Sequence, residues 1–181
     1  MPGAFCHDVA VSLAICLLLD EAAELAVRRL WVRLEEAGVP TLLSHTHGRH
    51  VPHVSYATLI DYRLEPVISA LSDLPDVGPM VLRFDAVGLF PRSRCWLAPA
   101  VTSELLARQA AVVSAAVSTG ADLHRHYRSG SWVPHLTLSP RLHLEELATV
   151  AKAAYDVLPL ASTVSRVTLI DTSTGERYVP R

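Results

Sequence analysis

Lysine is almost absent from this sequence, and charge of either sign is scarce. Lys152 is the only lysine among 16 basic residues, charged residues make up 19% of the 181 positions, and the net charge is −2. A protein that binds duplex nucleic acid through salt-dependent phosphate contacts carries a clear excess of basic residues. The composition therefore argues against a dedicated duplex-binding protein.

Long hydrophobic runs are missing as well. The run Val9–Leu19 is mostly apolar but spans only eleven residues, and a helix needs about 20 to cross a bilayer. Asp8 and Asp20 flank this run, which also lacks the basic segment that opens a secretory signal peptide. We therefore expect no membrane association and a cytoplasmic location.

Cysteine is sparse. Cys6, Cys16 and Cys95 are an odd number, and no two of them form a C-x-x-C pair. No disulfide framework or thiolate zinc site follows from this pattern. We expect reduced, partly buried cysteines in a cytosolic protein.

What the sequence does have is apolar content in alternating strand and helix patterns. Half of the residues are apolar, which favours a folded chain, either one domain or two small lobes on a shared core. We predict strands over Asp8–Leu19, Pro52–Ile60, Met80–Phe90, Arg94–Val101, Trp132–Ser139 and Val164–Asp171. We predict helices over Asp20–Ala37, Asp61–Leu74, Thr102 or Ser103 to Ser118, and His143–Leu158, with a hairpin at Pro91–Ser93. The two halves look alike, which hints at an internal duplication.

Two short segments, residues 51–55 and 133–137, support the duplication more strongly. They read Val-Pro-His-Val-Ser and Val-Pro-His-Leu-Thr and lie 82 residues apart. A histidine two residues before a hydroxyl is common by chance, but the shared Val-Pro flank and the aliphatic residue between them are not. We interpret the duplicated pentapeptide as a functional motif.

Side chains two residues apart in a strand point to the same face. His53 and Ser55 would then share one face, and His135 and Thr137 would share another, so that two imidazoles and two hydroxyls can meet around a small anion. One imidazole would take a proton from the attacking group and the other would protonate the leaving oxygen. The hydroxyls would donate hydrogen bonds to phosphate oxygens. This chemistry needs no metal or other cofactor.

The paired motifs, His53-Val54-Ser55-Tyr56 and His135-Leu136-Thr137-Leu138, resemble those of the 2H phosphoesterase superfamily. Within it, the chain resembles the bacterial 2′-5′ RNA ligase-like (LigT-like) group from about Val9 to Asp171. The resemblance implies a two-lobed, pseudo-twofold α+β fold over residues 1–181, with antiparallel-dominated sheets lining a central cleft and helices outside.

The resemblance also implies metal-independent hydrolysis of a 2′,3′-cyclic phosphate or a related nucleotide or RNA-end phosphodiester. Some members join or cleave 2′-5′ linkages in RNA. His53 and His135 would be the catalytic acid and base, in an order that the sequence leaves open, and Ser55 and Thr137 would bind phosphate. Tyr56 departs from the family pattern, which commonly has an aliphatic residue there, and strand alternation favours a place for it in the core.

Other residues are weaker candidates. Tyr127 and Arg128, in the polar loop Asp122–Ser131, together with Trp132 and Arg141, are possible substrate contacts. Two alternatives stay open: a non-catalytic nucleotide- or RNA-binding module on the same fold, and a metal-handling protein.

The metal alternative depends on His45, His47 and His50, which precede His53 at short spacing. Histidine-rich tracts can bind zinc, nickel or copper. The polar flanks instead favour a surface loop, and we expect no dedicated metal site. No obligate protein partner is predicted.

Overall fold

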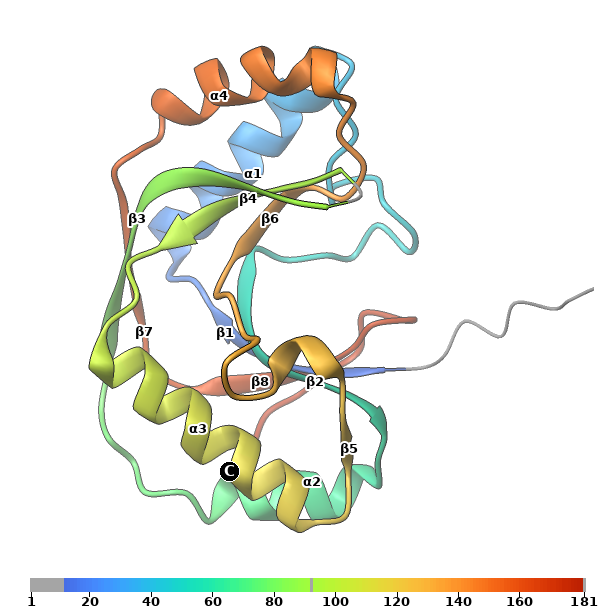
Figure 1. Ribbon diagram of the computed structural model, residues 1–181, viewed down its shortest axis with the longest axis vertical. Helices are drawn as coiled ribbons and strands as arrows, with labels where there is room; N and C mark the ends of the chain where they lie inside the picture. The colour runs from blue at the N-terminus through green and yellow to red at the C-terminus, as the bar shows by residue number, and fades with distance from the viewer. Residues whose placement is uncertain (1–11, 92, 181) are drawn as a thin grey trace, which may run out of the picture.

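The computed structural model describes residues 12–91 and 93–180, and the two-lobed α+β fold expected from the sequence is confirmed (Figure 1). The helices are α1 (Glu21–Glu36), α2 (Leu64–Ser72), α3 (Ser103–Ser118) and α4 (Leu147–Tyr155), with short 3-10 turns η1 (Arg125–Tyr127) and η2 (Leu144–Glu146). The strands are β1 (Leu13–Leu18), β2 (His53–Asp61), β3 (Met80–Phe90), β4 (Arg94–Pro99), β5 (Asp122–Leu123), β6 (Leu136–Ser139), β7 (Leu160–Val164), β8 (Val167–Asp171) and β9 (Arg177–Tyr178).

The strands form two antiparallel sheets. The first has the order β5-β2-β1-β8-β9 and the second the order β6-β4-β3-β7. Helices α2 and α3 pack on each other and α3 packs on β2, whereas α1 packs on α4 and β7. Figure 1 accordingly shows α1 and α4 together at one end of the molecule and α2 and α3 at the other. Each sheet therefore contains strands from both halves of the chain.

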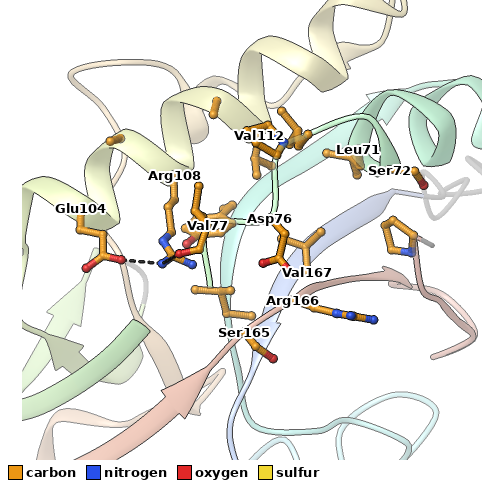
Figure 2. A pocket seen from close by; sticks show the side chains of 17 residues that line it. Leu71, Ser72, Asp76, Val77, Glu104, Arg108, Val112, Ser165, Arg166 and Val167 are labelled. Carbon is orange, nitrogen blue, oxygen red and sulfur yellow. Dashed lines mark hydrogen bonds and ion pairs between the residues drawn. The ribbon is translucent and has the colours of Figure 1, made fainter. Parts of the chain in front are cut away.

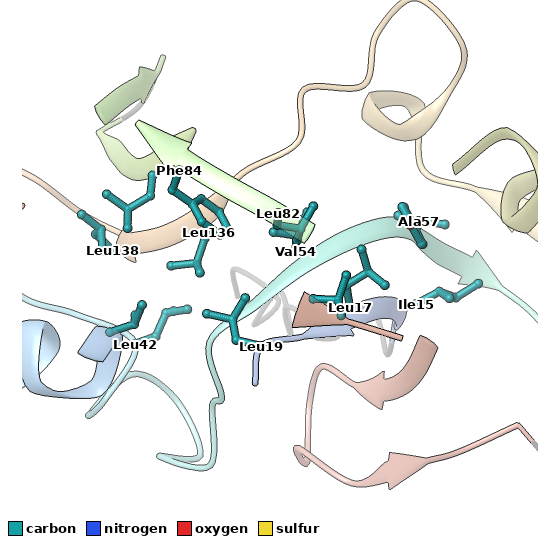
Figure 3. Packing of buried hydrophobic residues seen from close by; sticks show 14 of the residues in the cluster. Ile15, Leu17, Leu19, Leu42, Val54, Ala57, Leu82, Phe84, Leu136 and Leu138 are labelled. Carbon is teal, nitrogen blue, oxygen red and sulfur yellow. The ribbon is translucent and has the colours of Figure 1, made fainter. Parts of the chain in front are cut away.

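One hydrophobic cluster joins the two sheets. It contains Leu17 and Val54 of the first sheet together with Leu82, Phe84 and Leu136 of the second (Figure 3). All five are 2% exposed or less. Shared burial of this kind makes the two sheets one cooperative core rather than two independent ones.

Tyr56 and Leu138, which follow the hydroxyl residues of the two motifs, belong to this core as well. Tyr56 is 1% exposed and Leu138 is fully buried. The predicted core position of Tyr56 is confirmed.

Asp20 starts α1 as the sequence predicted. Its carboxylate accepts a hydrogen bond from the backbone nitrogen of Ala23 at 3.0 Å, the geometry of a helix N-cap. The same carboxylate accepts from the nitrogen of Thr163 in β7 at 2.7 Å. These bonds hold the pKa of Asp20 below its ordinary value, the cap to Ala23 being the largest cause. The cap therefore also anchors α1 to the second sheet.

Two predicted strands differ from the structure at the second half of the chain. The expected strand Trp132–Ser139 is ordered as β6 only from Leu136, because Pro134 has no N–H to give to a ladder and the carbonyl of Val133 is already bonded to the ring of His135. The expected strand Val164–Asp171 is ordered as β8 only from Val167, and Val164 is instead the last residue of β7, a strand of the other sheet that the sequence did not predict.

Smaller differences concern element ends. The helix expected over Asp61–Leu74 is shorter, because Asp61 still belongs to β2 and pairs with Asp122 of β5. The first strand begins at Leu13 rather than Asp8, and residues 8–11, like Cys6, lie outside the described part of the chain. The last helix is divided into η2 and α4. The hairpin around residues 91–93 is confirmed by the pairing of β3 with β4.

Candidate active site

The two motifs pair with a neighbouring strand in the same way, although β2 is an inner strand of its sheet and β6 an edge strand. Ser55 pairs with Cys16 of β1, and Thr137 pairs with Trp96 of β4. In both ladders the register shifts at this pair, and the residue after the hydroxyl, Tyr56 or Leu138, is the unmatched one. Such bulges redirect side chains and are common beside active sites. The internal repeat seen in the sequence is therefore repeated in the local geometry.

Each motif histidine makes the same kind of hydrogen bond to the backbone two residues before it. The Nδ1 atom of His53 lies 2.7 Å from the carbonyl oxygen of Val51, and Nδ1 of His135 lies 2.8 Å from that of Val133. Because a carbonyl only accepts, Nδ1 carries the proton in each ring. Nε2 is thus the nitrogen left for acid–base chemistry in both.

The surroundings of His53 favour its protonated form. Burial lowers its pKa, but the Cys16 side chain, which is hydrogen-bonded to the imidazole, and the Val51 carbonyl both raise it, and the net value is about 9. The Cys16 thiol also lies 3.4 Å from the hydroxyl oxygen of Ser55. Cys16 therefore contacts both functional side chains of the first motif.

The surroundings of His135 favour its neutral form. The ring of Phe90 meets it edge-on at 4.9 Å between centroids, and the ring of Trp96 lies 6.0 Å away. Burial lowers the pKa of His135, and the positive charges of His53 and Arg94 lower it further, although its bond to Val133 acts in the opposite direction. The two histidines are thus close enough to sense each other's charge, and their pKa values lie on opposite sides of the ordinary value.

Two indoles tie the motifs to the rest of the protein. Trp132 donates from Nε1 to the backbone carbonyl of Ser55 at 3.0 Å, and Trp31 of α1 donates to that of Thr137 at 3.3 Å. Each bond reaches from one half of the chain to the motif of the other. The positions of Ser55 and Thr137 therefore depend on both halves.

Among the predicted substrate contacts, Tyr127 and Trp132 lie beside the first motif. The hydroxyl of Tyr127 hydrogen-bonds with Ser55 and Thr58, and its pKa is raised, chiefly by burial. Trp132 also packs near Tyr56, with ring centroids 6.1 Å apart.

The two predicted arginines lie elsewhere. Arg128 is exposed and borders a hollow beside Val113 and Val117 of α3. Arg141 is also exposed and acts on His45, whose pKa is lowered by burial and then by the arginine charge.

Arg94 is a site residue that the sequence analysis missed. It is exposed at the start of β4, and its charge contributes to the lowered pKa values of His135, His45 and His124. In a chain with so many arginines, no local pattern singles it out. The β3–β4 register, which pairs Arg94 with Phe90, is the information that was needed.

The rings of the histidine-rich loop make contacts within the protein. The rings of His47 and His50 lie 4.2 Å apart, but Nδ1 of His47 accepts from the nitrogen of Arg49, and Nε2 of His50 is bonded to the hydroxyl of Thr46. Among residues 12–91 and 93–180, no group of three histidine, cysteine or acidic side chains is placed to hold a metal ion. Burial, with the neighbouring histidine charges, lowers the pKa of His50 to about 4.

No helix in the described part of the chain combines the length and the apolar character needed to span a membrane. The two cysteines of this part, Cys16 and Cys95, are free and buried.

Solved structures share this fold. E. coli LigT complexed with 3′-AMP matches with a TM-score of 0.62 at 17% identity, over 93% of this chain and 92% of that one. A crystal structure described as a phosphoesterase matches at 0.61 and 16% identity, over 94% of each chain. Usb1 of Kluyveromyces marxianus matches at 0.52 and 12% identity, over 95% and 98%. No curated protein sequence matches the chain.

The family itself is established by sequence. The family model described as the 2′-5′ RNA ligase superfamily matches residues 19–176, which include both histidine motifs and nearly all of both sheets. With duplicated motifs in equivalent bulged strands and a LigT-like arrangement of the sheets, this chain belongs to the 2′-5′ RNA ligase superfamily, a group of 2H phosphoesterases.

Proposed function

We propose that this protein is a metal-independent phosphoesterase that hydrolyses a 2′,3′-cyclic phosphate or a related nucleotide or RNA-end phosphodiester. One observation carries the proposal: two histidines are held in the same orientation by matching Nδ1–carbonyl bonds, yet their pKa values are displaced in opposite directions. Paired groups whose environments separate their pKa values are typical of acid–base catalysis.

The pKa values support one division of the two roles in the hydrolytic direction. His135, neutral at pH 7, takes a proton on Nε2 from the water that attacks phosphorus. His53, protonated at pH 7, gives a proton to the ribose oxygen as its bond to phosphorus breaks. One proton is taken up and one released, so the open phosphate monoester leaves the histidine pair with their states exchanged. Ligation of a 2′-5′ linkage would use the same pair in the reverse sense.

The charge that develops on phosphate has donors nearby. The hydroxyls of Ser55 and Thr137 lie in equivalent positions beside the two histidines, and hydrogen bonds from them would stabilise the non-bridging oxygens. Arg94, whose charge reaches His135, would supply a cation for the same phosphate.

A nucleotide is the substrate class that the relatives support. E. coli LigT has been solved with 3′-AMP and Usb1 of Kluyveromyces marxianus with uridine monophosphate. In this chain, the ring of Tyr127 lies beside Ser55, where it can contact the ribose or the base. The free cysteines Cys16 and Cys95 suit a reducing cytoplasm.

The test is turnover of a 2′,3′-cyclic nucleotide in EDTA, with the 2′- and 3′-phosphate products resolved. Replacing His53 or His135 by alanine should lower kcat at least about 10²-fold, the usual contribution of a general acid or base. His143→Ala, which removes an exposed histidine from the start of η2, should keep the wild-type rate.

Circular dichroism would confirm that each variant is folded. Full activity in either His53→Ala or His135→Ala would contradict the proposal. Tight binding of the cyclic nucleotide without any product would favour the binding-module alternative instead.

A further inference from the structure

A cavity of about 450 Å³ lies behind the first motif, between α2, α3 and the first sheet (Figure 2). Its walls include Leu17 of β1, Leu71 of α2, Val112 of α3 and Val167 of β8. The histidines and hydroxyl residues of the two motifs do not line the cavity, but Tyr56 does. The cavity is therefore separate from the proposed catalytic groups although it shares strand β2 with them.

Two polar atoms at this cavity have no hydrogen-bond partner in the described part of the chain. The hydroxyl of Tyr56 is one, on a side chain only 1% exposed, and Nε of Arg108 is the other. Both are hydrogen-bond donors. Buried polar groups are nearly always satisfied in folded proteins, so each of these donors lacks the acceptor that its burial calls for.

The rest of the Arg108 guanidinium is already occupied. Its terminal nitrogens donate to the backbone oxygens of Gly78, at 2.8 Å, and Val77, and to the carboxylate of Glu104, the pair joined by the dashed line in Figure 2. These bonds fix the plane of the guanidinium, so that Nε keeps its position whether or not a ligand is present. The positive charge of Arg108 also reaches Tyr56, which places the two orphan donors in the same electrostatic environment.

The charges around the cavity balance. Its lining contains two basic residues, Arg108 and Arg166, and two acidic residues, Asp76 and Glu104, and is otherwise mostly apolar. A site of balanced charge gives no advantage to an anion or a cation, and its volume lies within the range of small-molecule sites, about 300–1,000 Å³.

We propose that this cavity binds a neutral, predominantly apolar small molecule whose carbonyl oxygen accepts hydrogen bonds from the Tyr56 hydroxyl and from Nε of Arg108. The apolar body of the ligand contacts Leu71, Val112 and Val167. The aromatic residue by which this chain departs from its family's motif is thus a ligand-binding residue on the side of β2 that the phosphoesterase chemistry does not use.

The probe is 6-propionyl-2-(dimethylamino)naphthalene, a neutral ketone whose emission moves to shorter wavelength when it leaves water. Titration of the full chain should give saturable, blue-shifted emission. Tyr56→Phe removes only the hydroxyl and should raise the Kd about two- to tenfold, the effect of one lost hydrogen bond.

A variant that fills the cavity provides a second test of ketone binding. Ala111 lines the cavity on α3, and Ala111→Phe should abolish saturable binding, whereas Ala110→Phe on the same helix, at an exposed position outside the lining, should not. Thermal unfolding followed by circular dichroism would show that both variants are folded. His53→Ala should bind the ketone as the wild type does, so the outcome is independent of the phosphoesterase test.

Three results would overturn the proposal. They are the absence of saturable binding to the folded wild-type protein, unchanged binding in Ala111→Phe, and tighter binding of the anionic probe 1-anilinonaphthalene-8-sulfonate than of the neutral ketone.

Discussion

The residue that faces each motif hydroxyl from the neighbouring strand is different in the two sheets. Cys16 faces Ser55, and Trp96 faces Thr137. A thiol that hydrogen-bonds with an imidazole stabilises the imidazolium, whereas an indole edge shields its imidazole from water and favours the neutral ring. This one cross-strand difference within a near-symmetric pair therefore accompanies the opposite pKa shifts of His53 and His135, on which their proposed roles as acid and base depend.

The wild-type pH profile should follow from this division. The proposed mechanism requires neutral His135, so kcat/KM should rise with pH through the lowered pKa of that residue, below its ordinary 6.5. It also requires protonated His53, so kcat/KM should fall as the pH passes about 9. The measurement is the pH dependence of cyclic-nucleotide hydrolysis.

Cys16→Ala should move only one limb of that profile. The side chain of Cys16 raises the pKa of His53, so its loss should shift the alkaline limb toward acid pH by about one to three units. The acid limb, which His135 sets, should stay in place. Cys95→Ala is the matched control, because Cys95 is equally buried but pairs with Ser139 in the other sheet. An unmoved alkaline limb in Cys16→Ala would show that Cys16 does not tune the acid.

At the scale of elements, the β3–β4 hairpin positions the wall around His135. Gly88 pairs with Trp96, and a Cβ at position 88 would lie 2.3 Å from two ring carbons of that indole. Phe90, from the same hairpin, stacks 4.8 Å from Trp96 and also meets His135. The glycine therefore lets the indole lie flat across β3, where its edge reaches the imidazole.

Gly88→Ala should displace that indole. We expect a loss of about 1–3 kcal/mol in the free energy of unfolding from overpacking, together with a rise in the pKa of His135 as its ring becomes more exposed. The checks are denaturant unfolding and the acid limb of the pH profile. Adding Trp96→Phe should recover part of the lost stability, because the smaller ring leaves room for the new methyl group. Equal losses in the single and double variants would contradict this packing argument.

Most of the secondary structure, but few of the contacts between strands, could be predicted from the sequence. Strand periodicity and the Asp20 cap predicted most helices and strands, and the repeated Val-Pro-His predicted the paired histidines. Contacts between distant strands could not be predicted: no local pattern brings Cys16 to Ser55 or Arg94 toward His135, because cross-strand register decides both. Strand β7 was not predicted for the same reason, because its pairing with β3 defines it, and only its last residue, Val164, lay in the predicted strand Val164–Asp171.

At the scale of the whole molecule, the halves of the chain are interlocked. Helix α1 of the first half packs on α4 and β7 of the second, and α3 of the second half packs on β2 and α2 of the first. The Asp20 carboxylate reaches Thr163, and the indoles of Trp31 and Trp132 bond across the halves. A repeat in sequence therefore does not correspond to a folding unit.

A chain cut in the β3–β4 hairpin should reveal this interlocking. We expect residues 1–91 and residues 92–181, expressed separately, to lack a cooperative thermal transition, because each would expose the core face of both sheets. Co-expressed, the two fragments should assemble into one species with a single transition and with phosphoesterase activity. Cooperative unfolding of either fragment alone would contradict the expectation.

The tryptophans lie around the two motifs, so the intrinsic fluorescence of the protein reports on that region. The chain has three, and all contact a motif: Trp31 through the Thr137 carbonyl, Trp132 through the Ser55 carbonyl, and Trp96 through the ring of His135. The tryptophan emission of the protein thus originates wholly from groups around the two histidines. Because an imidazolium quenches a neighbouring indole, the native fluorescence of the unlabelled protein can follow the protonation of His135 in real time.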